Sequence, residues 1–276
     1  MKYGSLLLFV FFILFGSNSI SQNAYDSIRC KTKSYTLILG YSTSLIGLQT
    51  LWYQPYQNGK FHVFNDSKEW YQMDKWGHFY ASYHLTQLGR SINCKNKNQS
   101  VLNSCSAWMF LALIEVMDGY SSGWGFSISD MAVNTLGTTL AILNSNQKAK
   151  YSMQLKFSFF PSPYAAQNPK LLGQNITESI LKDYNGQTYW LSYTPSLSKW
   201  PRWLAISLGY GIDGFINANP VTGKTSRKIS CSLDLNPHYL NIQSPWLKPV
   251  KWIFKYVKFP FPTINFKQNK VSLSII

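Results

Sequence analysis

The stretch DSKEWYQMDKWGHFYASYHLTQLG occupies residues 66–89 and decides the fold of the first half of the chain. Asp66 and Glu69 stand three residues apart, which is the spacing of a capping box, and Gly89 suits a helix stop. We therefore predict a helix over residues 67–88, with Asp66 and Glu69 serving only as its start. Inside it, an acid and a histidine stand four residues apart and so share one face.

Three further helices are expected around this one. Residues 35–53 carry no charge and are just long enough to cross the hydrocarbon of a bilayer, although polar residues interrupt them. Residues 101–118 are largely apolar, and residues 127–144 begin with the spacing of a second capping box. Four helices joined by short loops predict a bundle over residues 22–146, packed in or against a membrane.

Beyond residue 147 the hydrophobic pattern alternates with period two. Helices are expected near residues 169–184 and 245–257, the second with an aromatic stripe beside lysines, which suits either a membrane surface or packing on a sheet. The predicted fold class is therefore α+β: an N-terminal bundle of about four helices, then an antiparallel, β-rich C-terminal region with one or two amphipathic helices. The predicted strands cover residues 154–160, 188–194, 204–216, 229–236 and 270–276.

The first residues predict export. Lys2 precedes the apolar residues 6–15, and Ser19 and Ser21 are small residues at the positions that a signal peptidase reads. We predict a signal peptide over residues 1–21, then the helical unit 22–146 and the basic unit 147–276. The expected location is the bacterial cell envelope, as a periplasmic or membrane-associated protein.

Charge divides the chain unequally. The formal net charge is +15, and residues 147–276 hold sixteen Lys and Arg against four Asp and Glu. In an exported protein the available polyanions are lipid headgroups and anionic envelope polymers rather than nucleic acid, so these are the expected partners, together with other envelope proteins. A solvated basic surface without a specific partner is the alternative. The four cysteines form no zinc motif, and Cys94 and Cys105 are the nearest candidates for a disulfide.

Acidic residues gather in the helical half. Six of the eleven acids lie from Asp66 to Asp130, among otherwise apolar and aromatic residues. If the predicted helices face one another, their polar stripes meet in one centre. The candidate catalytic or binding residues are those on these stripes: Asp74, His78, Glu115, Asp118, Asp130 and Asn134.

Carboxylates this close cannot all stay ionised without a cation or shared protons. A divalent metal on Asp74, His78 and Glu115 would resolve the repulsion, because imidazole and carboxylate suit zinc, manganese or iron. Hydrogen bonds to His78 and Lys75, with one acid protonated, would also do so. His78 alone is more typical of a hydrogen-bonded core residue, and Asp130 of a capping box. Glu115 interrupts an apolar run and has no capping role, so it is the strongest candidate.

These residues form recognisable motifs: Asp74-Lys75-x-x-His78-Phe79, Ile114-Glu115-x-x-Asp118 and Ser129-Asp130-x-x-x-Asn134-x-x-Gly137. The pattern resembles the VanZ-like membrane proteins. With residues 123–127 included, it more closely resembles an uncharacterised family of predicted periplasmic lipoproteins, the YfiM-like proteins. The likeness covers residues 70–141, and signatures at residues 154–158, 182–190 and 208–211 extend it. It implies an envelope location and groups the six candidate residues. The chain lacks the lipoprotein Cys, so no acyl anchor is carried over.

Two functions are consistent with these patterns. The first is a non-catalytic structural or binding component of the envelope, in which the polar centre fixes the helix register and the basic half engages lipid or partner proteins. The alternative is a metal-dependent hydrolase or transferase acting on an envelope lipid or polymer, with Asp74, His78 and Glu115 as metal ligands or general base.

Overall fold

A computed structural model describes residues 22–53, 59–92, 94–143, 153–241, 244–268 and 270–275. The predicted signal peptide, residues 1–21, lies outside the described residues. So does the predicted boundary between the helical and basic units, because residues 144–152 are not described.

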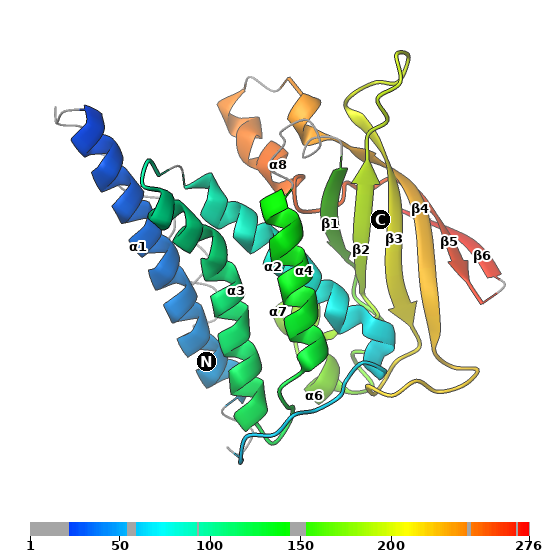
Figure 1. The fold of residues 1–276 in the computed structure, drawn as a ribbon. Coiled ribbons are helices and arrows are strands. Elements are labelled where there is room, and N and C mark those ends of the chain that lie inside the picture. The colour runs from blue at the N-terminus through cyan, green and yellow to red at the C-terminus, as the bar shows by residue number, and fades with distance from the viewer. Residues whose placement is uncertain are drawn as a thin grey trace.

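The first half forms the helical bundle (Figure 1). α1 (Gln22–Leu48) continues into the π-helical turn η2 (Gln49–Tyr53), so the helix predicted over residues 35–53 begins much earlier than expected. α2 (Met73–Ser91) packs against both α3 (Lys97–Tyr120) and α4 (Ile128–Leu143), while α1 lies along α3.

Close approach of the helices in the bundle depends on glycine. A Cβ on Gly137 of α4 would overlap the Ser82 hydroxyl of α2, and a Cβ on Gly89 would overlap the backbone carbonyl of Asn103 in α3. Small residues at such crossings let neighbouring backbones come near one another. The polar side chains on the facing helices are thereby brought within bonding distance.

The second half is one antiparallel sheet whose strands pair in chain order (Figure 1). The predicted α+β class is confirmed. The strands are β1 (Met153–Phe159), β2 (Gln187–Tyr193), β3 (Leu204–Asp213), β4 (Ser226–Leu235), β5 (Pro262–Lys267) and β6 (Lys270–Ile275). β5 was not predicted, since its alternation is short and begins at a proline.

The two helices predicted in the second half are shorter in the structure than expected. Residues 169–184 form α6 (Pro169–Leu172) and α7 (Ile176–Lys182), separated at Gly173, whose φ of 103° only glycine adopts readily. Residues 245–257 form the 3-10 turn η5 (Pro245–Leu247) and α8 (Lys248–Ile253).

The predicted start of α2 is also wrong. The 3-10 turn η3 (Glu69–Gln72) precedes α2, and the residue before the helix is Gln72, with a φ of 65° and no side-chain cap. Trp70 and Tyr71 also have positive φ values. Both rings are held by tertiary packing, because each contacts Phe215 at ring-centroid distances of 5.6 and 5.0 Å. Packing therefore overrides the local capping pattern, and Asp66 is free for another role.

Aromatic packing joins the bundle to the sheet. Tyr80 of α2 contacts Phe157 of β1 and Tyr189 of β2, at ring-centroid distances of 6.1 and 5.8 Å. The buried core at this junction comprises Trp70, Met73, Leu172, Tyr189, Ile212 and Phe215.

One disulfide closes a long loop in the bundle. Cys94 pairs with Cys30 of α1, so Cys94 and Cys105 do not pair, although they are nearest in sequence. Cys105 lies within α3, whereas Cys30 is brought to Cys94 by the packing of α1.

Candidate functional site

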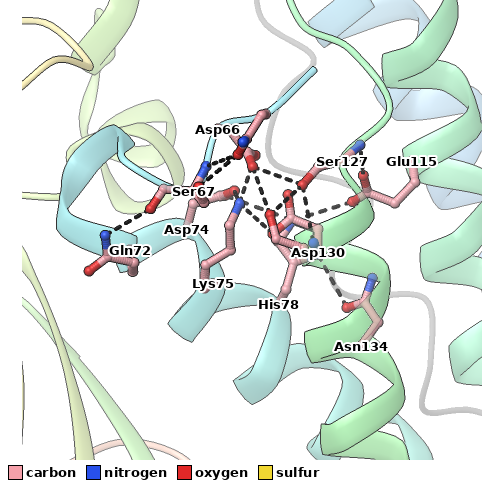
Figure 2. A network of polar contacts seen from close by, with 12 residues as sticks. Asp66, Ser67, Gln72, Asp74, Lys75, His78, Glu115, Ser127, Asp130 and Asn134 are labelled. Atoms are coloured by element: carbon pink, nitrogen blue, oxygen red, sulfur yellow. Dashed lines mark hydrogen bonds and ion pairs between the residues drawn. The ribbon is translucent and has the colours of Figure 1, made fainter. Parts of the chain in front are cut away.

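Lys75 stands at the middle of the polar centre (Figure 2). Its ammonium lies 2.7 Å from an oxygen of Asp66, 2.7 Å from Asp130 and 3.4 Å from Asp74. The Lys75 side chain is 10% exposed and that of Asp130 is 4% exposed. A buried charge of this kind requires a partner, and here one cation ties α2 to α4 and to the segment before η3.

Asp66 belongs to this centre and is not a helix start. Its Oδ1 accepts hydrogen bonds from the hydroxyls of Ser127 at 2.8 Å and Ser129 at 3.0 Å. Burial opposes ionisation of Asp66, but its hydrogen bond and charge pairing with Lys75 hold its pKa below the usual value. The capping-box spacing concealed this residue, because no other local pattern marks Asp66 as part of a site.

The N-terminus of α4 shows half of the predicted capping box. The backbone N–H of Asp130 donates to Ser127 Oγ at 3.1 Å, as the box requires. The reciprocal bond comes from elsewhere, since the N–H of Ser127 donates to Glu115 Oε2 at 3.2 Å. Glu115 therefore takes the role expected of Asp130, and the Asp130 carboxylate is released to pair with Lys75.

His78 is oriented by Asn134 (Figure 2). The His78 Nδ1 lies 3.2 Å from Asn134 Oδ1, an acceptor, so Nδ1 carries the proton of this bond. The other ring nitrogen, Nε2, faces Glu115 Oε1 at 3.6 Å and Asp74 Oδ1 at 3.8 Å. Burial disfavours the imidazolium, but the charges of Asp74, Asp130 and Glu115 outweigh it and raise the pKa of His78 to about 8.

Three carboxyls of the centre hold protons more tightly than usual. Burial raises the pKa of Glu115 to about 8 and the pKa values of Asp118 and Asp130 to about 7. Asp118 lies to one side, where it accepts a hydrogen bond from the Tyr53 hydroxyl at 2.8 Å. The centre thus relieves its charge repulsion with shared protons and with the Lys75 ammonium.

The structure brings five of the six predicted site residues together beside Lys75, and the sixth, Asp118, flanks them. Tyr184 was not predicted as a site residue, although it lies in the signature at residues 182–190. Its hydroxyl donates to Asp74 Oδ1 at 2.8 Å and connects the C-terminal half to the centre. The signature identified the segment, but only the fold shows where its phenol points.

Three side chains of the centre are spaced to hold a metal ion. One ligand atom each from Asp74, His78 and Asp130 lies within 4.8 Å of the others. The predicted ligand Glu115 approaches His78 from α3. Such nitrogen and oxygen donors suit zinc, manganese or iron.

Residues 62–146 match the model of the family described as "Predicted periplasmic lipoprotein (DUF2279)". The matched segment contains all six predicted site residues, and the description confirms the expected location: exported, periplasmic or envelope-associated. No curated protein and no solved structure matches the chain.

The sheet provides a second candidate site, because its two faces are reversed relative to a soluble protein. Strand register aligns Leu191, Leu208, Cys231, Ile264 and Leu273 in one row across five strands. This apolar face packs on α2 at β1, at β2 and at Tyr210 of β3, and most of the rest of it is exposed. Its exposed large side chains are Leu191, Tyr193, Ile206, Leu208, Ile229, Leu233, Ile264, Phe266, Val271, Leu273 and Ile275.

The opposite face of the sheet is polar and buried. Lys156 pairs with Asp234 at 2.8 Å, and both side chains are fully buried. Lys258, from the segment after α8, donates to Ser232 Oγ and covers the Trp190 ring. Further buried polar residues of this face are Gln154, Ser158, Thr188, Ser192, Ser207, Ser230, Thr263 and Asn265.

α8 lies near one end of the sheet (Figure 1). Together with η5 it carries aromatic and basic side chains. The side chain of Trp246 is 87% exposed, and Leu247, Val250, Trp252 and Ile253 are also exposed. Three lysines, at positions 248, 251 and 255, accompany them. Exposed tryptophans beside lysines are typical of segments at a membrane interface.

The bundle also exposes apolar side chains. Among the described residues, α3 is the one helix whose length and apolar composition would suffice to cross a bilayer, and only 28% of its apolar window is buried. The exposed apolar side chains on α3 and α4 include Met109, Leu113, Val116, Leu136, Leu140 and Leu143.

Proposed function

We propose that this protein is a non-catalytic component of the bacterial envelope that binds an anionic lipid surface through its C-terminal half. One observation carries the proposal: the exposed face of the sheet is apolar and the buried face is polar. An antiparallel sheet with one face in water ordinarily has the opposite arrangement. A large exposed apolar patch marks an interaction surface. Transfer of so many aliphatic side chains from water into lipid is favourable in free energy.

The charge of the same half selects among lipids. Residues 147–276 carry sixteen Lys and Arg against four Asp and Glu. Each basic residue near an anionic surface contributes about 1 kcal/mol to binding, an attraction that salt weakens. Lysines beside the exposed tryptophans of η5 and α8 therefore favour anionic headgroups over zwitterionic ones.

The polar centre has a supporting role in this proposal. Lys75 and its carboxylates join α2, α4 and the segment before η3, and Tyr184 links them to the C-terminal half. These bonds would hold the bundle in one register beside the sheet. The motifs of this centre also resemble those of VanZ-like membrane proteins, and this resemblance supports the proposed association with a membrane.

Vesicle flotation of the mature chain tests the proposal. We expect it to float with vesicles containing phosphatidylglycerol, weakly with pure phosphatidylcholine vesicles, and less as the salt concentration rises. Replacing Leu273 and Ile275 by Ser on β6, or Trp246 by Ser, should reduce the bound fraction. Val221→Ser is the matched control, because Val221 is also an exposed apolar residue but lies in the β3–β4 loop.

A second copy of the chain could cover the same apolar face instead. Analytical ultracentrifugation without lipid would then show a dimer that the β6 substitutions dissociate, and flotation would not respond to them. That combination, or equal binding to both kinds of vesicle at every salt concentration, would overturn the proposal.

A further inference from the structure

A polar position among three helices is enclosed by the side chain of His78 and by carboxylates. Asp74 comes from α2, Glu115 from α3 and Asp130 from α4 (Figure 2). The bond from Nδ1 to Asn134 Oδ1 leaves Nε2 aimed at carboxylate oxygens. Carboxylates facing Nε2 require a positive charge between them, and either a proton on Nε2 or a bound cation in place of that proton supplies it.

Glu115 supplies an independent observation. Its side chain is only 1% exposed, and its Oε1 has no hydrogen-bond partner among the described residues. Oε1 points to His78 Nε2 at 3.6 Å, beyond hydrogen-bonding distance. A buried carboxyl oxygen without a hydrogen-bond partner is costly, and a bound ion is one of the groups that can satisfy such an atom.

The surrounding hydrogen bonds orient the donor atoms. Asn134 holds the His78 ring, the Tyr184 hydroxyl donates to Asp74, and the Ser127 N–H donates to the second oxygen of Glu115. Metal-binding histidines and carboxylates are usually fixed in this way by groups behind them. Lys75 pairs with Asp66 and also with one oxygen each of Asp74 and Asp130, so it limits the excess of negative charge while each of these two ligands keeps a second oxygen.

The spacing also agrees with a metal ion. Tetrahedral ligands at zinc bond lengths lie about 3.3 Å from one another. Glu115 Oε1 and His78 Nε2 are 3.6 Å apart, and the ligand atoms of Asp74, His78 and Asp130 lie within 4.8 Å of one another. Small side-chain movements toward a common centre would complete the coordination.

We propose that this position binds one divalent transition-metal ion of the zinc or manganese class. The ligands are His78 Nε2, Asp74 and Asp130, and Glu115 Oε1 completes the set. The site stands on observations separate from the lipid-binding surface, and it goes beyond that function.

Metal analysis of the mature chain tests the proposal. The protein is stripped with a chelator, dialysed against Zn²⁺ or Mn²⁺, and measured by inductively coupled plasma mass spectrometry. We expect one equivalent of metal per chain and a higher melting temperature for the loaded protein. Co²⁺ substitution should add visible absorption bands of a site with nitrogen and oxygen ligands.

Two isosteric variants locate the ion. Glu115→Gln and Asp74→Asn should weaken binding by about tenfold or more, since each removes a charged donor. Asp213→Asn is the matched control, because Asp213 is a partly buried, ion-paired acid outside the centre. Circular dichroism confirms that each variant is folded.

The wild-type measurement alone can overturn the proposal. A folded wild-type chain that binds no stoichiometric Zn²⁺, Mn²⁺ or Co²⁺ would refute it, even if both variants failed to fold. Equal binding by folded Glu115→Gln and wild-type chains would remove Glu115 from the ligand set and refute the site as stated. Vesicle flotation of the metal-free protein tests lipid binding independently, so failure of the metal proposal can be told apart from failure of the lipid-binding proposal.

Discussion

Removing the Lys75 ammonium is the perturbation with the largest expected effect on the bundle. Lys75→Met retains a long, unbranched side chain but leaves Asp66 and Asp130 without their shared cation. Breaking a buried ion pair from one side costs about 3–5 kcal/mol, because the remaining charge stays buried and unpaired. That is about a fifth or more of the roughly 5–15 kcal/mol by which a folded protein is stable.

Lys95 offers a matched control for this experiment. It pairs with Asp26 at 2.9 Å, but the two side chains are 68% and 38% exposed. Exposed ion pairs contribute about 0–1 kcal/mol, so Lys95→Met should be nearly neutral. Lys75→Arg, which keeps the charge, should lose less stability than Lys75→Met.

Urea denaturation followed by far-UV circular dichroism gives the free energy of unfolding of each variant. Adding Asp130→Asn to Lys75→Met should recover part of the loss, because it removes the unpaired charge. If Lys75→Met lost no more stability than Lys95→Met, the central position of Lys75 in the network would be refuted.

Three further predictions concern packing, covalent linkage and protonation. Gly137→Ala should cost about 1–3 kcal/mol in urea denaturation, because its Cβ would overlap the Ser82 hydroxyl; an unchanged stability would contradict the close helix crossing. Replacing Cys30 and Cys94 by Ser should cost about 2–4 kcal/mol, since their disulfide closes a long loop, and a reductant should then have no further effect on that variant. Burial raises the pKa of Glu115 from 4.5 to about 8, so the folded chain retains a proton that the unfolded chain releases, and the unfolding free energy should fall as pH rises from about 4.5 to 8. Glu115→Gln should flatten that fall, and an identical pH profile in the variant would exclude Glu115 as its source.

The fold class was predictable because hydrophobic periodicity is a local property. Capping-box spacings and uncharged, apolar stretches located the bundle helices, and period two located five of the six described strands. Element boundaries were less predictable where tertiary contacts prevail. Trp70 and Tyr71 pack on Phe215, which is remote in sequence, and this packing displaced the start of α2.

Most residues that gather at the candidate site could be predicted from the sequence, but the hydrogen bonds and ion pairs among them could not. The spacing of Asp74 and His78 and the isolation of Glu115 in an apolar run identified these three residues. Asp66 was lost because its spacing to Glu69 imitates a capping box, whereas its carboxylate actually bonds residues about sixty positions away. No local pattern could have shown that the Glu115 side chain caps α4 in place of Asp130.

The alternating pattern of the strands was predicted correctly, but it did not predict that the polar face of the sheet is the buried one. Alternation in β4 shows that one face is apolar and the other polar, but not which of them is buried. That choice depends on what covers each face. Here the segment containing Lys258 covers the polar face, and the apolar face is largely uncovered.

Carbene footprinting of residues 22–276, with and without anionic vesicles, tests lipid binding by the sheet most directly. Leu273 of β6 is 79% exposed and Trp246 of η5 is 87% exposed, so both should be labelled strongly in solution. Phosphatidylglycerol vesicles should protect peptides from β6 and from η5 and α8, while the β3–β4 loop containing Val221 should keep its labelling. Unchanged labelling of β6 and α8 on vesicle-bound protein would contradict this expectation.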